Sequence, residues 1–372
     1  MGRRRRILYL MHVDWRWIKQ RPQFLAEGLA EEHDVLVLHR FCLTGRRLLA
    51  GDEARLPVRP LLPVPTGRKG LRWLTTPLQR KWVRFAAHDF DPDIVWITHP
   101  TLIETLPSRL MTLPLIYDCM DDAFSFSATQ NRISLLRELE ELLVERSVSI
   151  LCSSDCLRRL LINRYGPGIS TKLSLVRNGF STEMTADVSD TSTAKTARPA
   201  NSRCSVAYFG TIAEWFDFDL LLQCLAENES VDFHLIGPVL LQRPPQHERL
   251  RYHAAVPHQQ LSDVVAQFDA YMMPFHASPL IQSVDPVKLY EYLALGKEVV
   301  SICYPEIERF GDYVHFYRTR SDFIRIIGAL TTGQLSTKNS HGESYAFLGC
   351  NSWRSRLGFI NQLLQTLPSA SA

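Results

Sequence analysis

Short apolar runs alternate with stretches of helical spacing along almost the whole chain. Each apolar run is short enough for one strand, and the runs fall into two series. The first series predicts strands at 6–11, 34–39, 93–98, 114–119, 148–153 and 172–176. The second series predicts strands at 205–209, 232–236, 253–256, 270–274, 298–303 and 314–317. The helical patterns between them cover 22–30, 134–146, 157–165, 217–228, 259–268, 287–295 and 321–330. Because strand–helix–strand alternation produces parallel sheets with helices on both faces, the pattern predicts an α/β protein with two such sheets.

A stretch that cannot form a core separates the two series. Residues 183–203 contain 4 Thr, 3 Ser and 4 Ala, and they lack Leu, Ile and aromatic residues. This composition predicts an interdomain linker. The last helical pattern begins at Asn351 or Ser352, which are good N-cap residues. We therefore expect an N-terminal domain, a linker, a second domain and a C-terminal helix that returns to the first domain, at 1–182, 183–203, 204–345 and 346–372.

The composition agrees with two domains and excludes several classes of protein. At about 150 residues per domain, 372 residues suggest two domains. With 45% hydrophobic and 22% charged residues, the chain is unlike disordered, collagen-like or disulfide-rich proteins. The 42 Lys and Arg oppose 39 Asp and Glu, and this net +3 argues against a uniformly basic nucleic-acid binder. No apolar run reaches the about 18 residues of a membrane span, and we expect a cytosolic protein. The eight cysteines include no CxxC pair, so free thiols are expected rather than a zinc site.

The net charge hides one strongly basic segment. Residues 43–90 carry ten Lys and Arg against Asp52, Glu53 and Asp89, which gives a local charge of +7, and Trp73 and Trp82 lie among the cations. One interpretation is a solvated loop and helix. Another is a surface that docks on an anionic membrane or grips an anionic acceptor. RNA binding has the same electrostatics, but no RNA-binding motif accompanies the segment.

Ligands of open parallel sheets bind where strands end and helices begin, and the second series of strands offers such positions. Gly210 and Thr211 follow the strand 205–209, and a glycine there lets backbone amides approach a phosphate, although a simple turn is the alternative. A second group surrounds a helix start: Pro286 and Val287 open the helix, Ser283 or Asp285 lies near its cap, and Lys288 and Glu291 share a face. The helix start and Lys288 favour a phosphate, and Glu291 can accept hydrogen bonds from ribose hydroxyls; a local Lys–Glu ion pair is the alternative.

Two further strand ends could hold a flat base. They carry the small apolar pairs Gly237–Pro238 and Val256–Pro257. The chain contains neither GxGxxG nor GxxxxGK[ST], so it lacks the fingerprints of a nicotinamide or flavin site and of a P-loop.

The first series of strands carries candidate acid–base groups. Asp118, Asp121 and Asp122 lie at the end of the strand 114–119, where mutual repulsion can keep one of them partly protonated. Such a carboxylate suits general-base work or hydroxyl binding, and capping is the alternative for Asp121 and Asp122. The remaining candidates are His99, after the strand 93–98, and four residues on the acceptor side, His12, Asp14, Trp15 and Arg21. A structural hydrogen-bonding role is the alternative for either histidine.

Several segments, in this order along the chain, resemble one family. They are Arg21-Pro-Gln-Phe-Leu-Ala, Tyr117-Asp-Cys-Met-Asp-Asp, Val176-Arg-Asn-Gly, Phe209-Gly-Thr-Ile-Ala-Glu-Trp-Phe-Asp, Leu235-Ile-Gly-Pro and Pro286-Val-Lys-Leu-Tyr-Glu-Tyr-Leu-Ala-Leu-Gly-Lys-Glu-Val-Val. Together they resemble GT-B glycosyltransferases of the family 4 type, and more narrowly the group of teichuronic-acid and exopolysaccharide biosynthesis. The resemblance implies two Rossmann-like domains that face a central cleft.

The resemblance also implies roles for individual residues. The second domain would bind a nucleoside diphosphate-sugar, with Gly210 and the helix start at Pro286 near the diphosphate, Lys288 neutralising it and Glu291 on the ribose. The first domain would bind a glycan or lipid-linked acceptor, with Asp118, Asp121 or Asp122 near the reacting centre. The helix dipole and Lys288 would replace a metal, and no cofactor is expected besides the donor substrate.

Two departures from the family leave the stereochemistry open. Ser283 stands eight positions before Glu291, where many members carry a first glutamate, and residues 211–219 hold no Arg or Lys. A retaining mechanism follows the family, whereas the aspartates would permit an inverting base. A sugar-nucleotide epimerase of the same fold and a non-catalytic scaffold docked on a membrane through residues 43–90 are the alternative functions.

Overall fold

The computed structural model describes residues 3–41, 55–62, 72–126, 129–181, 202–338 and 341–368. The expected linker therefore lies outside the described residues except for Ser202 and Arg203. The chain forms two compact units. Unit 1 comprises residues 1–178, 283–285 and 353–372, and unit 2 comprises residues 179–282 and 286–352.

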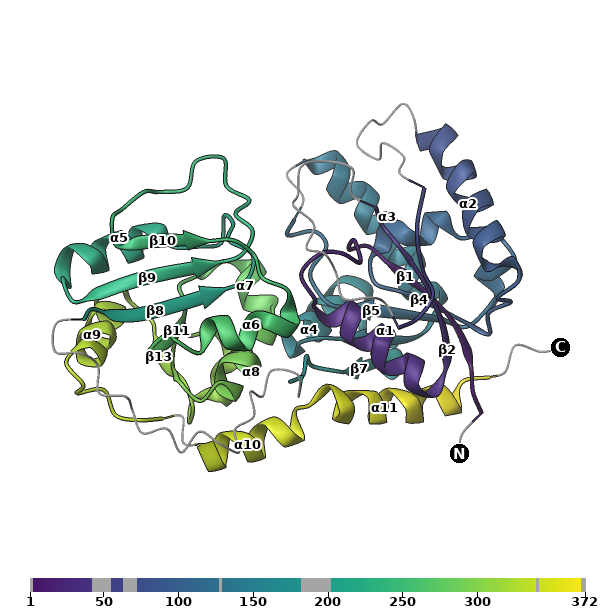
Figure 1. Ribbon diagram of the computed structural model, residues 1–372. Helices are drawn as coiled ribbons and strands as arrows, with labels where there is room; N and C mark the ends of the chain where they lie inside the picture. Colours follow the sequence, from purple (N-terminus) through teal and green to yellow (C-terminus); the bar gives the residue numbers. More distant parts are fainter. Residues whose placement is uncertain are drawn as a thin grey trace. The chain divides into compact units, whose positions relative to one another are not determined.

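Unit 1 is built on a seven-stranded parallel sheet in the order β3-β2-β1-β4-β5-β6-β7 (Figure 1). Its strands are β1 (Arg6–Met11), β2 (Asp34–His39), β3 (Val58–Pro60), β4 (Ile94–Ile97), β5 (Leu115–Cys119), β6 (Ser147–Cys152) and β7 (Leu173–Leu175). The central strands are buried almost throughout, as expected of a parallel sheet covered on both faces.

Helices and short 3-10 helices cover this sheet. The α-helices are α1 (Arg21–Glu32), α2 (Arg72–His88), α3 (Gln130–Arg146), α4 (Asp155–Tyr165) and α11 (Trp353–Thr366). The 3-10 helices are η2 (Pro100–Thr105), η3 (Leu110–Thr112) and η4 (Pro167–Lys172). The C-terminal helix α11 packs along α1 (Figure 1). Trp353 stacks there on Phe24, with ring centroids 5.1 Å apart.

Unit 2 has a six-stranded parallel sheet in the order β10-β9-β8-β11-β12-β13. Its strands are β8 (Cys204–Phe209), β9 (Val231–Ile236), β10 (Leu250–His253), β11 (Ala270–Met273), β12 (Glu298–Ile302) and β13 (His315–Tyr317). Its helices are α5 (Phe218–Glu227), α6 (His258–Val265), α7 (Pro279–Ser283), α8 (Val287–Ala294), η7 (Pro305–Phe310), α9 (Arg320–Thr331) and α10 (His341–Cys350). Both sheets are parallel and Rossmann-like, which confirms the predicted α/β architecture.

Two of the expected elements need correction. The strand expected at 253–256 is β10 at Leu250–His253, because buried Leu250 pairs with Phe233 and holds the edge strand three residues earlier. Pro286 does not occupy the first helical position; it is the N-cap of α8, and no side chain caps that helix end. The sequence pattern also did not predict β3 or α2.

The packing of the last two helices determines where the unit boundary falls. α10 packs on α8 and belongs to unit 2, whereas α11 packs on α1 and belongs to unit 1, so the division falls at 352/353 where 345/346 was expected. Residues 283–285 belong to unit 1 although the flanking segments belong to unit 2. Within the described residues, no helix is long and apolar enough to span a bilayer.

Candidate functional site

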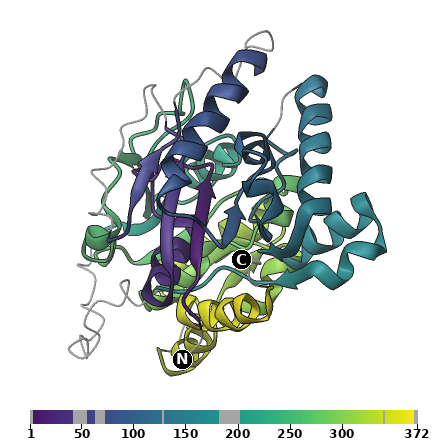
Figure 2. The same cartoon turned by 90° about the vertical axis from the view of Figure 1, so that its right-hand side faces the viewer.

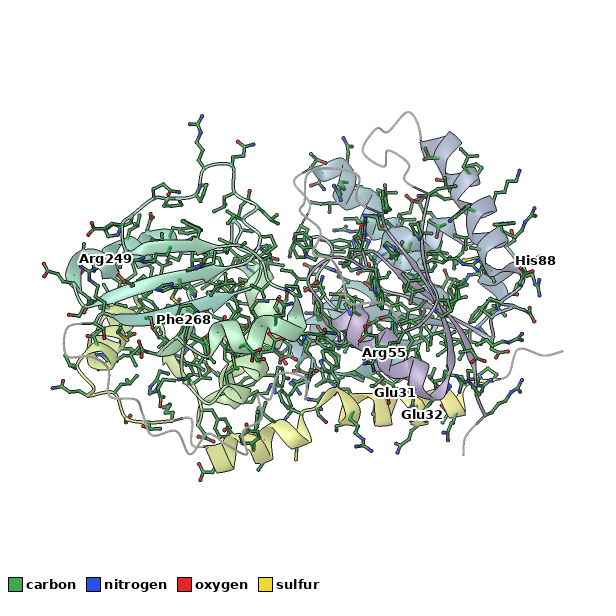
Figure 3. The ribbon with its side chains drawn as sticks, viewed as in Figure 1. Glu31, Glu32, Arg55, His88, Arg249 and Phe268 are labelled. Atoms are coloured by element: carbon green, nitrogen blue, oxygen red, sulfur yellow. The ribbon has the colours of Figure 1, made fainter. Side chains whose placement is uncertain are left out.

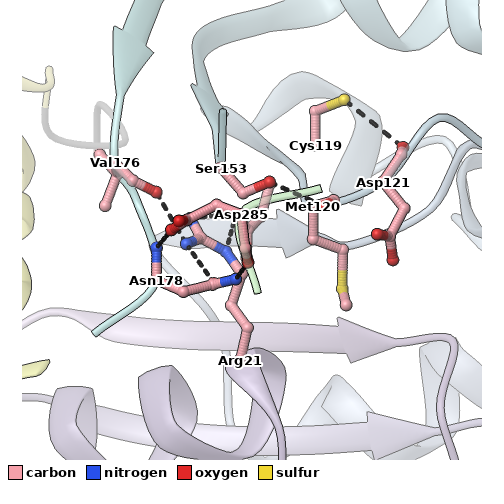
Figure 4. Close-up of polar contacts among 9 residues, drawn as sticks. Arg21, Cys119, Met120, Asp121, Ser153, Val176, Asn178 and Asp285 are labelled. Atoms are coloured by element: carbon pink, nitrogen blue, oxygen red, sulfur yellow. Dashed lines mark hydrogen bonds and ion pairs between the residues drawn. The ribbon is translucent and has the colours of Figure 1, made fainter. Parts of the chain in front are cut away.

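Unit 1 contains a buried ion pair at the start of α1. Arg21 Nη2 and Nε lie 2.7 and 2.9 Å from Asp118 Oδ1, and the two residues are 1% and 0% exposed. Arg21 Nη1 donates to the backbone carbonyl of Val176 at 2.7 Å (Figure 4). The structure therefore places Arg21 and Asp118 inside unit 1 and out of reach of a substrate.

Asn178 extends this pair to the segment 283–285. Its Oδ1 accepts from Arg21 Nη1 at 3.3 Å, and its backbone N–H donates to Asp285 Oδ2 at 2.7 Å. Asn178 Nδ2 also donates to the Asp285 carbonyl (Figure 4). We call Arg21, Asp118, Asn178 and Asp285 the Arg21 network. Because its carboxylate is engaged here, Asp285 does not cap α8; Ser283 likewise lies in unit 1, where its carbonyl accepts from Ser154 Oγ.

The two remaining aspartates at the end of β5 differ in their surroundings. Asp122 accepts hydrogen bonds from Ser125 Oγ and Arg164 Nη2, both at 2.8 Å, and this fixes the turn that follows the strand. The Asp121 carboxyl makes no hydrogen bond in the part of the chain that the structure describes. Burial, with help from the charges of Asp118 and Asp122 and against that of Arg21, raises the pKa of Asp121 to about 7. Asp121 can therefore exchange a proton near neutral pH, as a general base does.

Two histidines lie together at the carboxyl ends of β1 and β4. The His12 and His99 rings have centroids 5.0 Å apart. His99 Nδ1 accepts from the Thr101 N–H at 3.2 Å and lies 2.9 Å from Thr101 Oγ1, which itself accepts from Arg40 Nη2 at 3.1 Å. Since Nδ1 is an acceptor, the neutral ring carries its proton on Nε2 and presents an N–H donor there.

Both histidines are held neutral. Burial, reinforced by the Arg40 charge, lowers the pKa of His12 to about 3. Burial also lowers the pKa of His99 well below its usual value, and the charges of His12, Arg40 and Arg132 act in the same direction. A neutral N–H donor and a carboxyl near its pKa, Asp121, are groups that can bind and orient hydroxyl groups.

Asp14 and Trp15 shape the loop after β1. Asp14 pairs with Arg16 at 3.0 Å and is 7% exposed. The Trp15 N–H donates to His39 Nδ1 at 3.1 Å, and its side chain is 9% exposed. These contacts give both residues a part in the loop structure.

In unit 2 the structure brings Gly210, Gly237 and Lys288 together. Gly210 and Gly237 have φ of +138° and +139°, conformations that a side chain rarely adopts. A Cβ on Gly237 would overlap the Gly210 carbonyl oxygen, and a Cβ on Gly210 would overlap Lys288 Cε. Glycine at 237 thus leaves room for the Gly210 backbone, and glycine at 210 lets the Lys288 side chain lie over the end of β8.

Lys288 is a cation without a protein partner at this position. It makes no hydrogen bond or ion pair within the described residues, and the alternative of a local ion pair with Glu291 is not formed. Burial lowers the pKa of Lys288, and the nearby Glu291 charge opposes this shift. A desolvated ammonium beside glycine backbone at a strand end is well suited to bind an anion such as a phosphate.

Glu291 pairs instead with a histidine that the sequence pattern did not single out. His258 Nε2 lies 3.2 Å from Glu291 Oε1, and the two residues are 8% and 6% exposed. His258 begins α6 directly after Pro257, the N-cap residue of that helix. Its signal in the sequence was its position next to the Val256–Pro257 pair.

The other expected donor residues lie at the same edge of the unit 2 sheet or just beyond it. Thr211 accepts from Tyr208 Oη through its carbonyl at 3.0 Å, and the Pro238 carbonyl accepts from the Ile212 N–H at 2.9 Å. Val256 and Pro257 follow β10 by three and four residues, and Val287 is the first residue of α8. Among the described residues, no three or more His, Cys, Asp or Glu side chains cluster as metal ligands.

Asp121→Asn should stabilise the protein more at pH 8 than at pH 5, by about 3 kcal/mol. The carboxyl has a folded pKa of about 7 against 3.8 in its ordinary state, so its ionised form is penalised only in the folded protein. That penalty is small near pH 4, grows as the pH rises and is complete above pH 7. Urea unfolding at both pH values measures it. Asp122→Asn is the control and should destabilise at pH 8; an equal effect of Asp121→Asn at the two pH values would contradict the assignment.

Replacing the arginines around the histidine pair should separate their effects. Arg40→Met should raise the pKa of both His12 and His99, because the Arg40 charge acts on both rings. Arg132→Met should raise the pKa of His99 alone. Nitrogen-15 NMR titration of the two rings measures both shifts and reports the tautomer. A neutral His99 protonated on Nδ1, or equal responses to the two substitutions, would show that the geometry is misassigned.

Comparison with known proteins gives a family match that lies almost entirely within unit 1. Residues 18–179 match the family model of a glycosyl transferase 4-like domain. The chain is 25% identical over 236 residues to a Bacillus subtilis (strain 168) protein named as a teichuronic acid biosynthesis glycosyltransferase, TuaH; the match covers 60% of this chain and 59% of that protein. The chain thus spans less than two thirds of the length of this curated relative.

Solved structures with the same fold cover nearly all of the chain. Anabaena HepE in complex with UDP and glucose has a TM-score of 0.70 at 18% identity, over 98% of this chain and 100% of that one. Sucrose-phosphate synthase from Thermosynechococcus elongatus has a TM-score of 0.71 at 12% identity, over 97% and 98%. Residues 18–179 are therefore similar to a glycosyl transferase 4-like domain, and the chain as a whole shares the two-domain GT-B fold of these solved structures.

Proposed function

We propose that this protein transfers a sugar from a nucleoside diphosphate-sugar to a cell-surface polysaccharide or a lipid-linked glycan. The observation that carries the proposal is the unpaired Lys288 ammonium over Gly210 in unit 2. The departing diphosphate needs positive charge and amide dipoles that are already in place when the glycosidic bond breaks. Lys288 and the start of α8 supply both.

The relatives support a nucleotide-sugar donor and a cell-envelope acceptor. HepE was solved in complex with UDP and with UDP-glucose, which makes uridine diphosphate the first donor nucleotide to test. TuaH is named for teichuronic acid biosynthesis. On this chain, Glu291 and His258 would hold the ribose, and the segments at Pro238 and Pro257 would contact the base.

Unit 1 would bind the acceptor. We propose that His99 donates from Nε2 to a substrate hydroxyl, that His12 lies beside it, and that Asp121 accepts a hydrogen bond or a proton. The Arg21 network holds the strand end that carries Asp121. We further propose a retaining, metal-independent reaction at the inner face of the plasma membrane, where a lipid-linked acceptor is found.

Lys288→Met should weaken UDP binding about 5- to 150-fold, the range expected for one lost charge-assisted hydrogen bond. Methionine keeps most of the side-chain volume over Gly210, so the fold should persist. Isothermal titration calorimetry with UDP measures the change. Lys297→Met, just beyond the end of α8, is the control and should leave the affinity unchanged. No binding of UDP, GDP or other nucleoside diphosphates to the wild-type protein would reject the proposal.

The chemistry is tested with the donor that binds and an extracted lipid-linked acceptor. Activity should survive EDTA, because Lys288 rather than a metal would carry the leaving-group charge. Proton NMR of the product should show the anomeric configuration of the donor. Loss of activity in EDTA that added Mg²⁺ restores would overturn metal independence, and inversion at the anomeric carbon would assign the aspartate side a base role.

A further inference from the structure

Helix α2 carries apolar side chains on a face that no other described element covers. Leu78 and Phe85, two helical turns apart, are 54% and 71% exposed. Trp82 lies between them on the same side, with its ring centroid 6.1 Å from that of Phe85. The Trp82 Nε1–H donates to the Pro60 carbonyl at 3.0 Å, so this ring is fixed next to the exposed pair.

The opposite face of α2 sets this orientation. Val83, Ala86 and Ala87 are 0%, 3% and 4% exposed and belong to the core of unit 1. The helix therefore cannot turn Leu78 and Phe85 inward without exposing its buried face. In Figure 2, α2 lies at the periphery of unit 1, and Figure 3 shows His88 of its last turn at the outer surface.

Cations flank the apolar pair. Lys81 and Arg84 are exposed on the same half of α2. Residues 55–88 contain eight Lys and Arg and no Asp or Glu, so positive charge is uninterrupted along this part of the sequence. A helix with protruding apolar side chains beside a row of cations has the pattern of a segment that lies in a bilayer interface.

We propose that α2 docks this protein on a bilayer that contains anionic lipid. Leu78 and Phe85 enter the boundary between headgroups and acyl chains, while Lys81 and Arg84 contact the lipid phosphates. The charge favours a membrane over a second copy of this chain, since two copies would place the same cations against each other. The docking itself is argued from the surface of α2. Its purpose, access to a lipid-linked acceptor, rests on the proposed function.

Vesicle flotation with the full chain tests the proposal. Vesicles of phosphatidylcholine with about 30% phosphatidylglycerol should carry the protein upward, and pure phosphatidylcholine vesicles should not. Lys81→Glu/Arg84→Glu should lower the partition coefficient at least about tenfold, since each basic residue near an anionic surface contributes about fivefold. Leu78→Ser/Phe85→Ser should lower it by a similar factor, and high salt should weaken binding of the wild-type protein.

Helix α11 provides matched controls. Arg354→Glu changes the charge of an exposed residue, and Phe359→Ser removes an aromatic side chain that is 46% exposed. Neither should change flotation. Equal losses in the α2 and α11 variants, or no flotation of the wild-type protein, would overturn the proposal. Self-association that Phe85→Ser abolishes, without vesicle binding, would assign this face to a second copy and would also overturn it.

UDP titration separates this proposal from the proposed function. The α2 variants should bind UDP like the wild-type protein, which also verifies that they fold. Flotation without any nucleotide binding would support membrane docking and reject the transferase. UDP binding without flotation would reject the proposal that α2 docks on a membrane and would leave the proposed function intact.

Discussion

The buried ion pair between Arg21 and Asp118 is the constraint on which unit 1 depends. Two opposite charges that are almost fully removed from water remain stable only if each is paired and hydrogen-bonded. Arg21 satisfies this through Asp118, the Val176 carbonyl and Asn178. Removing one partner of such a pair typically costs about 3–5 kcal/mol, because the other charge stays buried and unpaired. The pair therefore specifies a single arrangement of α1, β5 and the residues after β7.

The same network determines which acidic groups are left for chemistry. Asp118 forms an ion pair with Arg21, and Asp122 forms one with Arg164. Asp285 accepts a hydrogen bond from the Asn178 N–H. Asp121 is the member of the group 118–122 that keeps a carboxyl without a hydrogen bond in the described chain, and its pKa is raised to about 7. Unit 1 thus offers neutral donors and a nearly neutral carboxyl, whereas unit 2 offers one desolvated cation at Lys288. Hydroxyl recognition requires the first kind of group and phosphate recognition the second.

The sequence reveals those parts of the fold and the site that depend on local pattern. Buried strands such as β1 and β2 are apolar along their length, so their bounds follow from the runs at 6–11 and 34–39. Edge strand β10 has one buried residue, Leu250, and its position could not be read from apolar spacing. Helix α2 was not predicted from the apolar spacing because its outer face carries Leu78 and Phe85 among cations. The usual contrast between a polar and an apolar helix face is therefore weak in this segment.

In the site, Gly210 and Lys288 were identifiable because a strand end and a helix start carry local signatures. The Arg21 network was not, since it joins residues 97 and 107 positions apart and one sequence holds no record of such contacts. Two contacts that residue type and spacing suggested, the Lys288–Glu291 ion pair and the Asp285 cap, are therefore not formed. Lys288 and Glu291 stand at ion-pair spacing, yet Glu291 pairs with His258. Asp285 stands at a capping position, yet it accepts from the Asn178 N–H. A buried backbone N–H without an acceptor costs free energy, whereas the N–H groups of a helix end can be satisfied in other ways. The hydrogen bond to Asn178 is therefore the more favourable use of the carboxylate.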